Sequence, residues 1–150
     1  MSEGSNRGFW SVMIPVIVAG VSLVVLIVLN RPTGGAGGSS ATQANLRIAL
    51  AAAKTIETGG GSYADATPLA LGQGEPSLVF IGGDEASNDP NVISVSLAPT
   101  LWVGAARSSS GTCYWIRDDL AQGTAFGTST DCAADHLRTA TGSANGWPSS

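Results

Sequence analysis

The hydrophobic pattern is dominated by one uninterrupted apolar run, from Phe9 to Leu29, which contains no charged residue. A helix over this run would be about 30 Å long, which is the thickness of the hydrocarbon core of a bilayer. A removed secretory signal peptide would have a shorter apolar core and a small-residue cleavage site, and neither follows Leu29. The run therefore predicts a single transmembrane helix, with a kink near Pro15, where the ring removes a backbone donor.

The segments that flank this helix set the predicted domain boundaries. Residues 1–8 form a polar leader or cytoplasmic tail that is too short to fold, and residues 30–40 form a Gly-rich stretch that predicts a flexible linker. Residues 41–150 remain, which is enough for one domain with a core of ordinary size. The length of this domain and its two cysteines favour an extracytoplasmic position.

A second helix is predicted from Thr42 to about Thr58. Its apolar positions recur at steps of three and four residues and include Leu46, Leu50 and Ile56. We expect Ser40 or Thr42 to cap its N-terminus and the glycines at 59–61 to end it. The apolar face is narrow and rich in alanine, which suits close packing against a sheet.

The strands of that sheet are predicted in the second half of the chain. They are Leu78 to Ile81, Val92 to Ala98, Leu101 to Arg107 and Thr112 to Arg117, with a weaker run near Ala125 to Thr128 that would add an edge. In Val92 to Ala98 the apolar residues alternate with Ser94 and Ser96, which should point to the opposite face. The order of elements predicts an α+β fold, in which one helix packs on a small antiparallel sheet of about four strands.

Charge excludes one class of function. The net charge is −4, the seven basic residues are scattered, and Lys54 is the only lysine. Proteins that bind DNA or RNA present clustered basic residues, often with aromatic residues between them, and this chain has no such cluster. We therefore expect no nucleic-acid partner.

Few residues are candidates for chemistry. Cys113 and Cys132 favour a disulfide over a zinc site, because two thiolates and one distant histidine do not complete a tetrahedral shell. His136 is the only histidine, and with Asp131 and Asp135 it could hold a metal or form a base and its orienting partner, but a polar loop favours a lone surface histidine. We therefore expect no catalytic residue, metal or cofactor, and no enzyme activity.

Two further groups have a structural and a functional interpretation. Asp118 and Asp119 could hold a cation, but adjacent strand residues point to opposite faces, which favours a turn at a strand end. The aromatic residues could form an exposed ligand surface, although such residues are more often found in a core. This aromatic group consists of Trp102, Tyr114, Trp115 and Phe126.

Several separated motifs together resemble one protein family. They are NLRIALAAAKT (45–55), GSYADAT (61–67), EPSLVF (75–80), ISVSLA (93–98), AARSSSGTCYWIRDD (105–119) and GTAFGTSTDC (123–132). In this order they resemble the globular domain of type IV pilins from actinobacteria. The resemblance implies a long N-terminal helix on a small antiparallel sheet, with a C-terminal loop closed by a disulfide, and Cys113 and Cys132 fall where that disulfide is expected.

The resemblance extends to the N-terminus. Arg7, Gly8 and Phe9 stand directly before the apolar run, as in prepilin leaders, which a peptidase cuts after the glycine. It implies a structural subunit of a surface filament or secretion pseudopilus, held in the membrane before assembly. The implied partners are the lipid bilayer, a prepilin peptidase and other pilin subunits, and the implied location is the cell membrane or a surface filament.

Two departures from the family pattern bear on assembly. Met13 occupies the fifth position after the cleavage site, where major pilins carry a glutamate, and residues 31–40 interrupt what is usually a continuous helix. These departures favour a minor or atypical subunit. The alternative is a tethered extracytoplasmic module for binding or adhesion that has a pilin-like fold and forms no filament.

Overall fold

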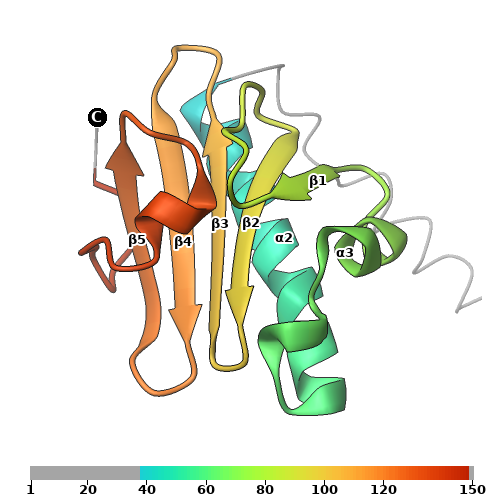
Figure 1. Cartoon of the computed structure of the whole chain (residues 1–150). Coiled ribbons are helices and arrows are strands. Elements are labelled where there is room, and N and C mark those ends of the chain that lie inside the picture. Colours follow the sequence, from blue (N-terminus) through green and yellow to red (C-terminus); the bar gives the residue numbers. More distant parts are fainter. Residues whose placement is uncertain (1–37, 149–150) are drawn as a thin grey trace, which may run out of the picture. The chain divides into compact units, whose positions relative to one another are not determined.

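The structure is a computed structural model in which residues 38–148 are described. The elements follow in the order α2 (Ser39–Gly60), η1 (Tyr63–Asp65), α3 (Pro68–Gly74), β1 (Val79–Gly82), β2 (Val92–Ala98), β3 (Leu101–Arg107), β4 (Cys113–Asp119), β5 (Gly123–Ser129) and η2 (Ala134–Leu137). The chain forms an α+β fold in which helices pack on one sheet, as the order of elements predicts (Figure 1).

Helix α2 is slightly longer than predicted and is capped differently. It begins at Ser39, so the prediction that the linker extends to residue 40 is wrong. It buries Leu46, Leu50 and their alanine neighbours, which confirms the predicted face. The residue at the N-cap is Gly38, and no side chain caps the helix there, so the capping role expected for Ser40 or Thr42 is wrong. Thr42 is buried, and its hydroxyl donates to the carbonyl of Gly38 at 3.3 Å. A capping hydroxyl would instead accept a hydrogen bond from a free backbone N–H of the first turn. At the other end Gly61 takes the left-handed conformation, as expected for the glycine run.

Two short helices, η1 and α3, follow α2 in the sequence and precede β1, and neither was predicted. In η1 the buried Tyr63 follows Ser62, whose hydroxyl accepts the N–H of Ala64. In α3 Thr67 accepts the N–H of Ala70, and Pro68 occupies the first turn, where its missing N–H costs nothing. Both helices are shorter than the window in which a periodic apolar pattern can be recognised.

The sheet has five strands in the order β1-β2-β3-β4-β5. Strands β2 to β5 form an antiparallel meander, which agrees with the predicted antiparallel sheet. Strand β1 pairs with β2 in parallel, so the prediction of a purely antiparallel sheet of about four strands is wrong. Residues 83–91 return the chain along the sheet before β2 begins, and Ala86 forms a bridge with Ala133 on the way. This return sets the direction of β2.

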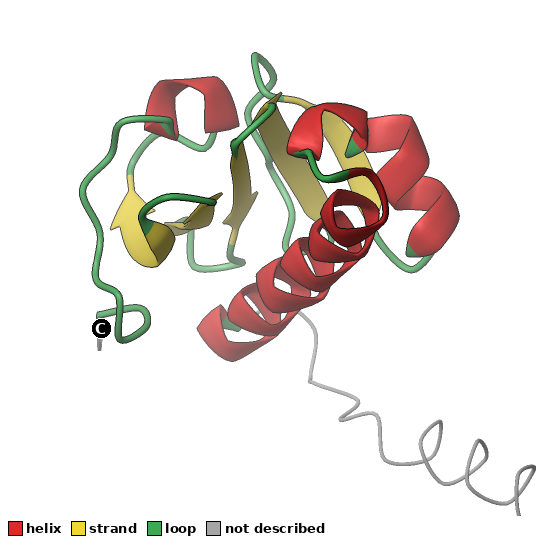
Figure 2. Ribbon diagram, turned by 90° about the horizontal axis from the view of Figure 1, so that it is seen from below, coloured by secondary structure: helices red, strands yellow, loops and turns green. Residues whose placement is uncertain are grey.

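Both faces of the sheet are covered, each by a different part of the chain. Helix α2 contacts β3 and β4 on one face, and Figure 2 shows this helix to one side of the strands. The opposite face carries a second apolar cluster, formed by Val103, Ala105, Cys113, Trp115, Cys132, Ala134 and Leu137. Ser94 and Ser96 point to this second face, as predicted, but they are buried under the segment that follows Cys132. Ala134 donates to Ser94, and Arg138 donates to Ser96.

The end of the chain wraps around the outer edge of β5. In this C-terminal strap (residues 138–148), Ser143 exchanges two backbone hydrogen bonds with Phe126, at 2.9 and 2.8 Å. The strap then reaches the helix side of the sheet, where the ring of Trp147 packs edge-on against Tyr114 and Phe126. The guanidinium of Arg47 on α2 lies 4.6 Å from the centre of the Trp147 ring. The strap thus joins β5 to α2.

Candidate functional site

A disulfide closes the β4–β5 hairpin. It joins Cys113, at the start of β4, to Cys132, which follows β5, and the two Cα atoms lie 5.4 Å apart. Neither cysteine has exposed surface. The bridge confirms the predicted pairing and explains why the weak run near Ala125 to Thr128 forms a complete strand: the ladder with β4 holds one side of β5 and the disulfide holds its end.

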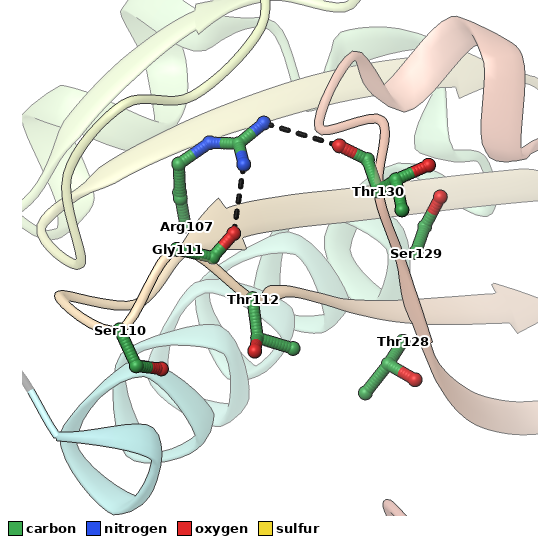
Figure 3. Close-up of a pocket in the computed structure, with 7 residues that line it drawn as sticks. All are labelled: Arg107, Ser110, Gly111, Thr112, Thr128, Ser129 and Thr130. Carbon is green, nitrogen blue, oxygen red and sulfur yellow. Dashed lines mark hydrogen bonds between the residues drawn. The ribbon is translucent and has the colours of Figure 1, made fainter.

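A shallow depression of about 700 Å³ lies between the β3–β4 turn and the end of β5 (Figure 3). One arginine and a set of small or hydroxyl-bearing residues line it: Arg107, Ser110, Gly111, Thr112, Thr128, Ser129 and Thr130. The lining contains no acidic residue and no aromatic ring. Its chemistry suits a polar ligand with several oxygen atoms.

The side chain of Arg107 joins three loops around this depression. Its Nε donates to the carbonyl of Ser87 at 3.2 Å, one terminal nitrogen donates to Gly111 at 2.8 Å, and the other donates to Thr130 at 3.3 Å. Figure 3 shows the guanidinium between the last two carbonyls. A guanidinium has five N–H groups, so these bonds leave donor capacity for a ligand oxygen. No local sequence pattern indicates this role, because all three acceptors are backbone oxygens.

Ser87 connects the same region to the disulfide. Its hydroxyl donates to the carbonyl of Val92 at 2.7 Å and accepts the N–H of Arg107 at 3.0 Å, while its own N–H donates to the carbonyl of Cys132 at 3.0 Å. Ser87 is only 1% exposed. The walls of the depression are therefore fixed by buried backbone contacts.

A second polar cluster lies on the helix side of the sheet and is centred on Asp118. One carboxylate oxygen accepts the Tyr63 hydroxyl at 2.5 Å, and the other accepts the Thr124 hydroxyl at 2.5 Å and the Lys54 ammonium at 3.1 Å. Burial raises the pKa of Asp118, but the hydrogen bonds from Thr124, Tyr63 and Lys54 outweigh burial and hold this pKa below its usual range. The pKa of Tyr63 is raised, mainly by burial and secondly by its hydrogen bond to Asp118.

This arrangement separates the two aspartates that the sequence places side by side. Asp119 accepts the N–H groups of Ala121 and Gln122 at 2.8 and 3.1 Å, which confirms the predicted turn at the end of a strand. Asp118 is 3% exposed and faces α2, so it is a buried anchor and not part of that turn. Its position two residues after Ile116 on the same face of β4 was a signal that could have identified it.

His136 lies on the surface, as predicted. Its side chain is 66% exposed, and its Nδ1 lies 2.5 Å from a carboxylate oxygen of Asp131. The hydrogen bond with Asp131 raises the pKa of His136. The pKa of Asp131 is lowered mainly by the hydrogen bond from the N–H of Ala133 and, to a smaller extent, by the hydrogen bond with His136. Asp135 binds Gly83 through its backbone N–H. Within residues 38–148, no group of three or more His, Cys, Asp and Glu side chains is placed to hold a metal ion.

The aromatic residues belong to the interior, which confirms their interpretation as core residues. Trp102, Tyr114 and Trp115 are each at most 2% exposed, and Phe126 is half-buried against the strap. Trp147, which the sequence analysis did not single out, donates its indole N–H to the carbonyl of Trp115 at 2.9 Å. These rings therefore form no open stacking surface.

The predicted membrane anchor and processing site lie outside the described residues. This applies to Gly8 and Phe9 at the expected cleavage position and to Pro15 and Leu29 within the apolar run. Between residues 38 and 148, no helix has the length and apolar character needed to cross a membrane.

Comparison with known proteins adds no family assignment. No family model, no curated protein and no solved structure matches the chain. The resemblance to type IV pilins therefore stays a prediction.

Proposed function

We propose that the chain is a membrane-anchored structural protein of the type IV pilin kind, acting as a minor or atypical subunit of a pilus or a secretion pseudopilus. The main support is the layout of the described residues: α2 packs on an antiparallel meander, and a disulfide between Cys113 and Cys132 closes the C-terminal region. This is the layout that the sequence resemblance implies. Because a fold alone does not fix a function, the uncharged run at residues 9–29 and the Gly8-Phe9 junction carry the rest of the proposal.

The outer face of α2 also supports a role in assembly. Ile48 is 41% exposed, and Ala44 and Ala51, which stand four residues before it and three residues after it, are exposed on the same side of the helix. These three side chains are uncharged. Arg47, which stands three residues after Ala44 and four before Ala51, is exposed beside them, and its guanidinium lies over the Trp147 ring. A neighbouring helix that packs on Ile48 would leave this charge at the rim of the contact.

The minor role follows from the N-terminal residues. Met13 offers no carboxylate to neutralise the N-terminal amine of a neighbouring subunit, and an unpaired charge is costly among packed apolar helices. The Gly-rich sequence before α2 is expected to act as a flexible tether between anchor and domain. A uniform filament of this chain alone is therefore not expected.

The proposal assigns the protein a place and a set of partners. The chain would sit in the cell membrane as a single-pass protein with its domain outside, or in a surface filament after processing. Its partners would be the lipid bilayer, a prepilin peptidase and other pilin subunits. The role is structural, so it requires no catalytic residue and no cofactor.

The decisive experiment is N-terminal and intact-mass analysis of the native protein, together with mass spectrometry of sheared surface filaments. We expect a mature chain that begins at Phe9, retained in the membrane after an alkaline carbonate wash, and present in filaments as a minority subunit. Ile48→Glu should reduce this incorporation, whereas the matched variant Leu69→Glu, at a 74% exposed position on α3, should not. Full-length protein in the soluble cytosol, or long filaments of this chain alone, would contradict the proposal.

The depression beside Arg107 favours a second candidate, a tethered binding or adhesion module. A hydroxyl-lined surface with one fixed cation could hold an oxygen-rich ligand, such as an acidic polysaccharide. In that case the N-terminus should remain uncut at Gly8, no other subunit should copurify, and Thr128→Ala should weaken binding to such a polysaccharide. Processing at Gly8 with recovery in filaments would exclude this second candidate.

A further inference from the structure

The C-terminal strap contains an asparagine–glycine pair directly before its anchoring residue, Trp147. Asn145 is the only one of the six asparagines in the chain that is followed by glycine. It is exposed, and Gly146 has a φ of 120°, a conformation that side-chain-bearing residues rarely adopt. Within residues 38–148, neither the Asn145 side-chain amide nor the Gly146 N–H has a hydrogen-bond partner; Asn145 binds only through its backbone N–H, to Ser143.

We propose that Asn145 is a site of spontaneous deamidation and that this modification releases the C-terminal strap from the edge of β5. The backbone nitrogen of Gly146 attacks Cγ of Asn145, a bond forms between them, and the bond from Cγ to Nδ2 breaks. The amide proton of Gly146 passes through solvent to the departing nitrogen, which leaves as ammonia. Water then opens the cyclic imide at either carbonyl, so that residue 145 becomes aspartate or isoaspartate.

The structure protects two of the other described asparagines, Asn45 and Asn91, whereas the exposed Asn88 is disfavoured only by its successor, because the side chain of Asp89 hinders the attack that Gly146 permits. At Asn45 the side-chain nitrogen is held by the carbonyl of Pro90 and the side chain of Asn91, each at 2.9 Å, and a branched residue, Leu46, follows inside a helix. After Asn91 the attacking nitrogen would be that of Val92, which donates to the carbonyl of Asp89 at 3.1 Å. Both asparagines lack the free nitrogen and the flexible successor that Asn145 has.

The site matters because the strap is fixed on both sides of it. Before it, Ser143 pairs with Phe126; after it, the Trp147 indole donates to the carbonyl of Trp115 at 2.9 Å, and its ring lies 4.8 Å from that of Phe126. Isoaspartate adds one carbon to the main chain between these two attachments. With the longer main chain, Ser143 and Trp147 can no longer both keep their contacts with the sheet. The strap then leaves the backbone N–H and carbonyl of Phe126 open to solvent or to another strand.

The test uses the full-length, disulfide-intact protein in mild detergent, incubated in warm, mildly alkaline buffer made with ¹⁸O-labelled water. Peptide mapping should find the label at residue 145, with isoaspartate in excess of aspartate, and no label at Asn45 or Asn91. After incubation, hydrogen exchange should show loss of protection at the Phe126 amide. The change should be absent in Asn145→Gln, which keeps an exposed amide but forms the cyclic intermediate poorly.

Each part of the proposal can fail separately. An unmodified Asn145, when a short synthetic peptide of the same sequence is modified under the same conditions, would overturn the assignment of the site. Complete conversion of Asn145 with undiminished protection at Phe126 would overturn the release of the strap. Equal loss of protection in Asn145→Gln would show that ageing loosens the strap by another route, which would also refute the proposal.

Discussion

Replacement of Asp118 by asparagine tests whether the buried carboxylate holds α2 and η1 to the sheet. The change keeps the size of the side chain but removes its charge and turns one acceptor into a donor. If the amide nitrogen takes the place of the oxygen that now binds the Thr124 hydroxyl at 2.5 Å and the Lys54 ammonium at 3.1 Å, it opposes both groups. The other position can still accept the hydroxyl of Tyr63. We therefore expect a large loss of stability without a loss of fold.

The magnitude follows from the contacts. A hydrogen bond to a charged group contributes about 1.5–3 kcal/mol, and a neutral one about 0.5–1.5 kcal/mol. The loss of one bond to the charged carboxylate and the weakening of another should therefore cost about 2.5–4.5 kcal/mol in the free energy of unfolding. Lys54 is 48% exposed, so Lys54→Ala should cost less than about 1 kcal/mol. Tyr63→Phe removes a single bond to the carboxylate and should cost about 1.5–3 kcal/mol.

The pH dependence gives an independent check. The pKa of Asp118 is lower in the folded state than in the unfolded state, so its contribution is complete above the ordinary aspartate pKa and is lost as the pH falls through the lowered value. The pKa of Tyr63 is raised, so its contribution is complete below the ordinary tyrosine pKa and is lost at strongly alkaline pH. The difference between wild type and Asp118→Asn should therefore shrink in acid.

The assay is equilibrium unfolding in urea of the full-length, disulfide-intact protein in mild detergent, followed by tryptophan fluorescence at several pH values. The expected order of destabilisation is Asp118→Asn and Tyr63→Phe well above Lys54→Ala. A cost for Lys54→Ala as large as that for Asp118→Asn would refute the assignment of the energy to the buried hydroxyl bonds. A difference between wild type and Asp118→Asn that does not change with pH would refute the role of the charge.

Two further predictions concern the opposite face of the sheet. Joint replacement of Cys113 and Cys132 by serine removes a bridge between residues that are 19 positions apart and should lower the free energy of unfolding by about 3 kcal/mol, measured in urea; maleimide labelling of the denatured, unreduced wild type should find no free thiol. Gly127→Ala would place a Cβ against the ring of Trp115 and should cost about 1–3 kcal/mol in the same assay. Gly72→Ala, inside α3 with nothing within 4 Å, should instead stabilise the protein by about 0.4–1 kcal/mol.

The sequence predicts most elements of the described fold, because their patterns are local. Apolar residues at steps of three and four place α2, alternation places β2, and the short polar turn at residues 108–111 separates the runs that form β3 and β4; the three strands lie within two residues of their expected bounds. Strand β5 is weak in the sequence because it contains few apolar residues; it is stable because of its ladder with β4 and the disulfide, which are contacts with residues elsewhere in the chain.

The features that the sequence does not predict depend on contacts between residues that are far apart in the chain. Tyr63 and Asp118 are 55 positions apart, and no pattern near either residue shows that they meet. Arg107 binds backbone oxygens, which every residue possesses, so its partners leave no trace in the sequence. The parallel pairing of β1 is set by the path of residues 83–91, and this path depends on a bridge to Ala133 near the end of the chain.

Ser94 and Ser96 show how these distant contacts change the meaning of a local pattern. Alternation of serine with apolar residues is the usual sign of a strand with one face in water. Here the serine face is covered, and each hydroxyl receives a hydrogen bond from the segment that follows the disulfide. A covering segment with few apolar residues can remain on a polar face only if such bonds and a covalent link hold it, since buried polar groups without partners would be costly. The disulfide, the two serines and the segment from Cys132 to Arg138 therefore act as one unit, which covers the sheet face opposite α2.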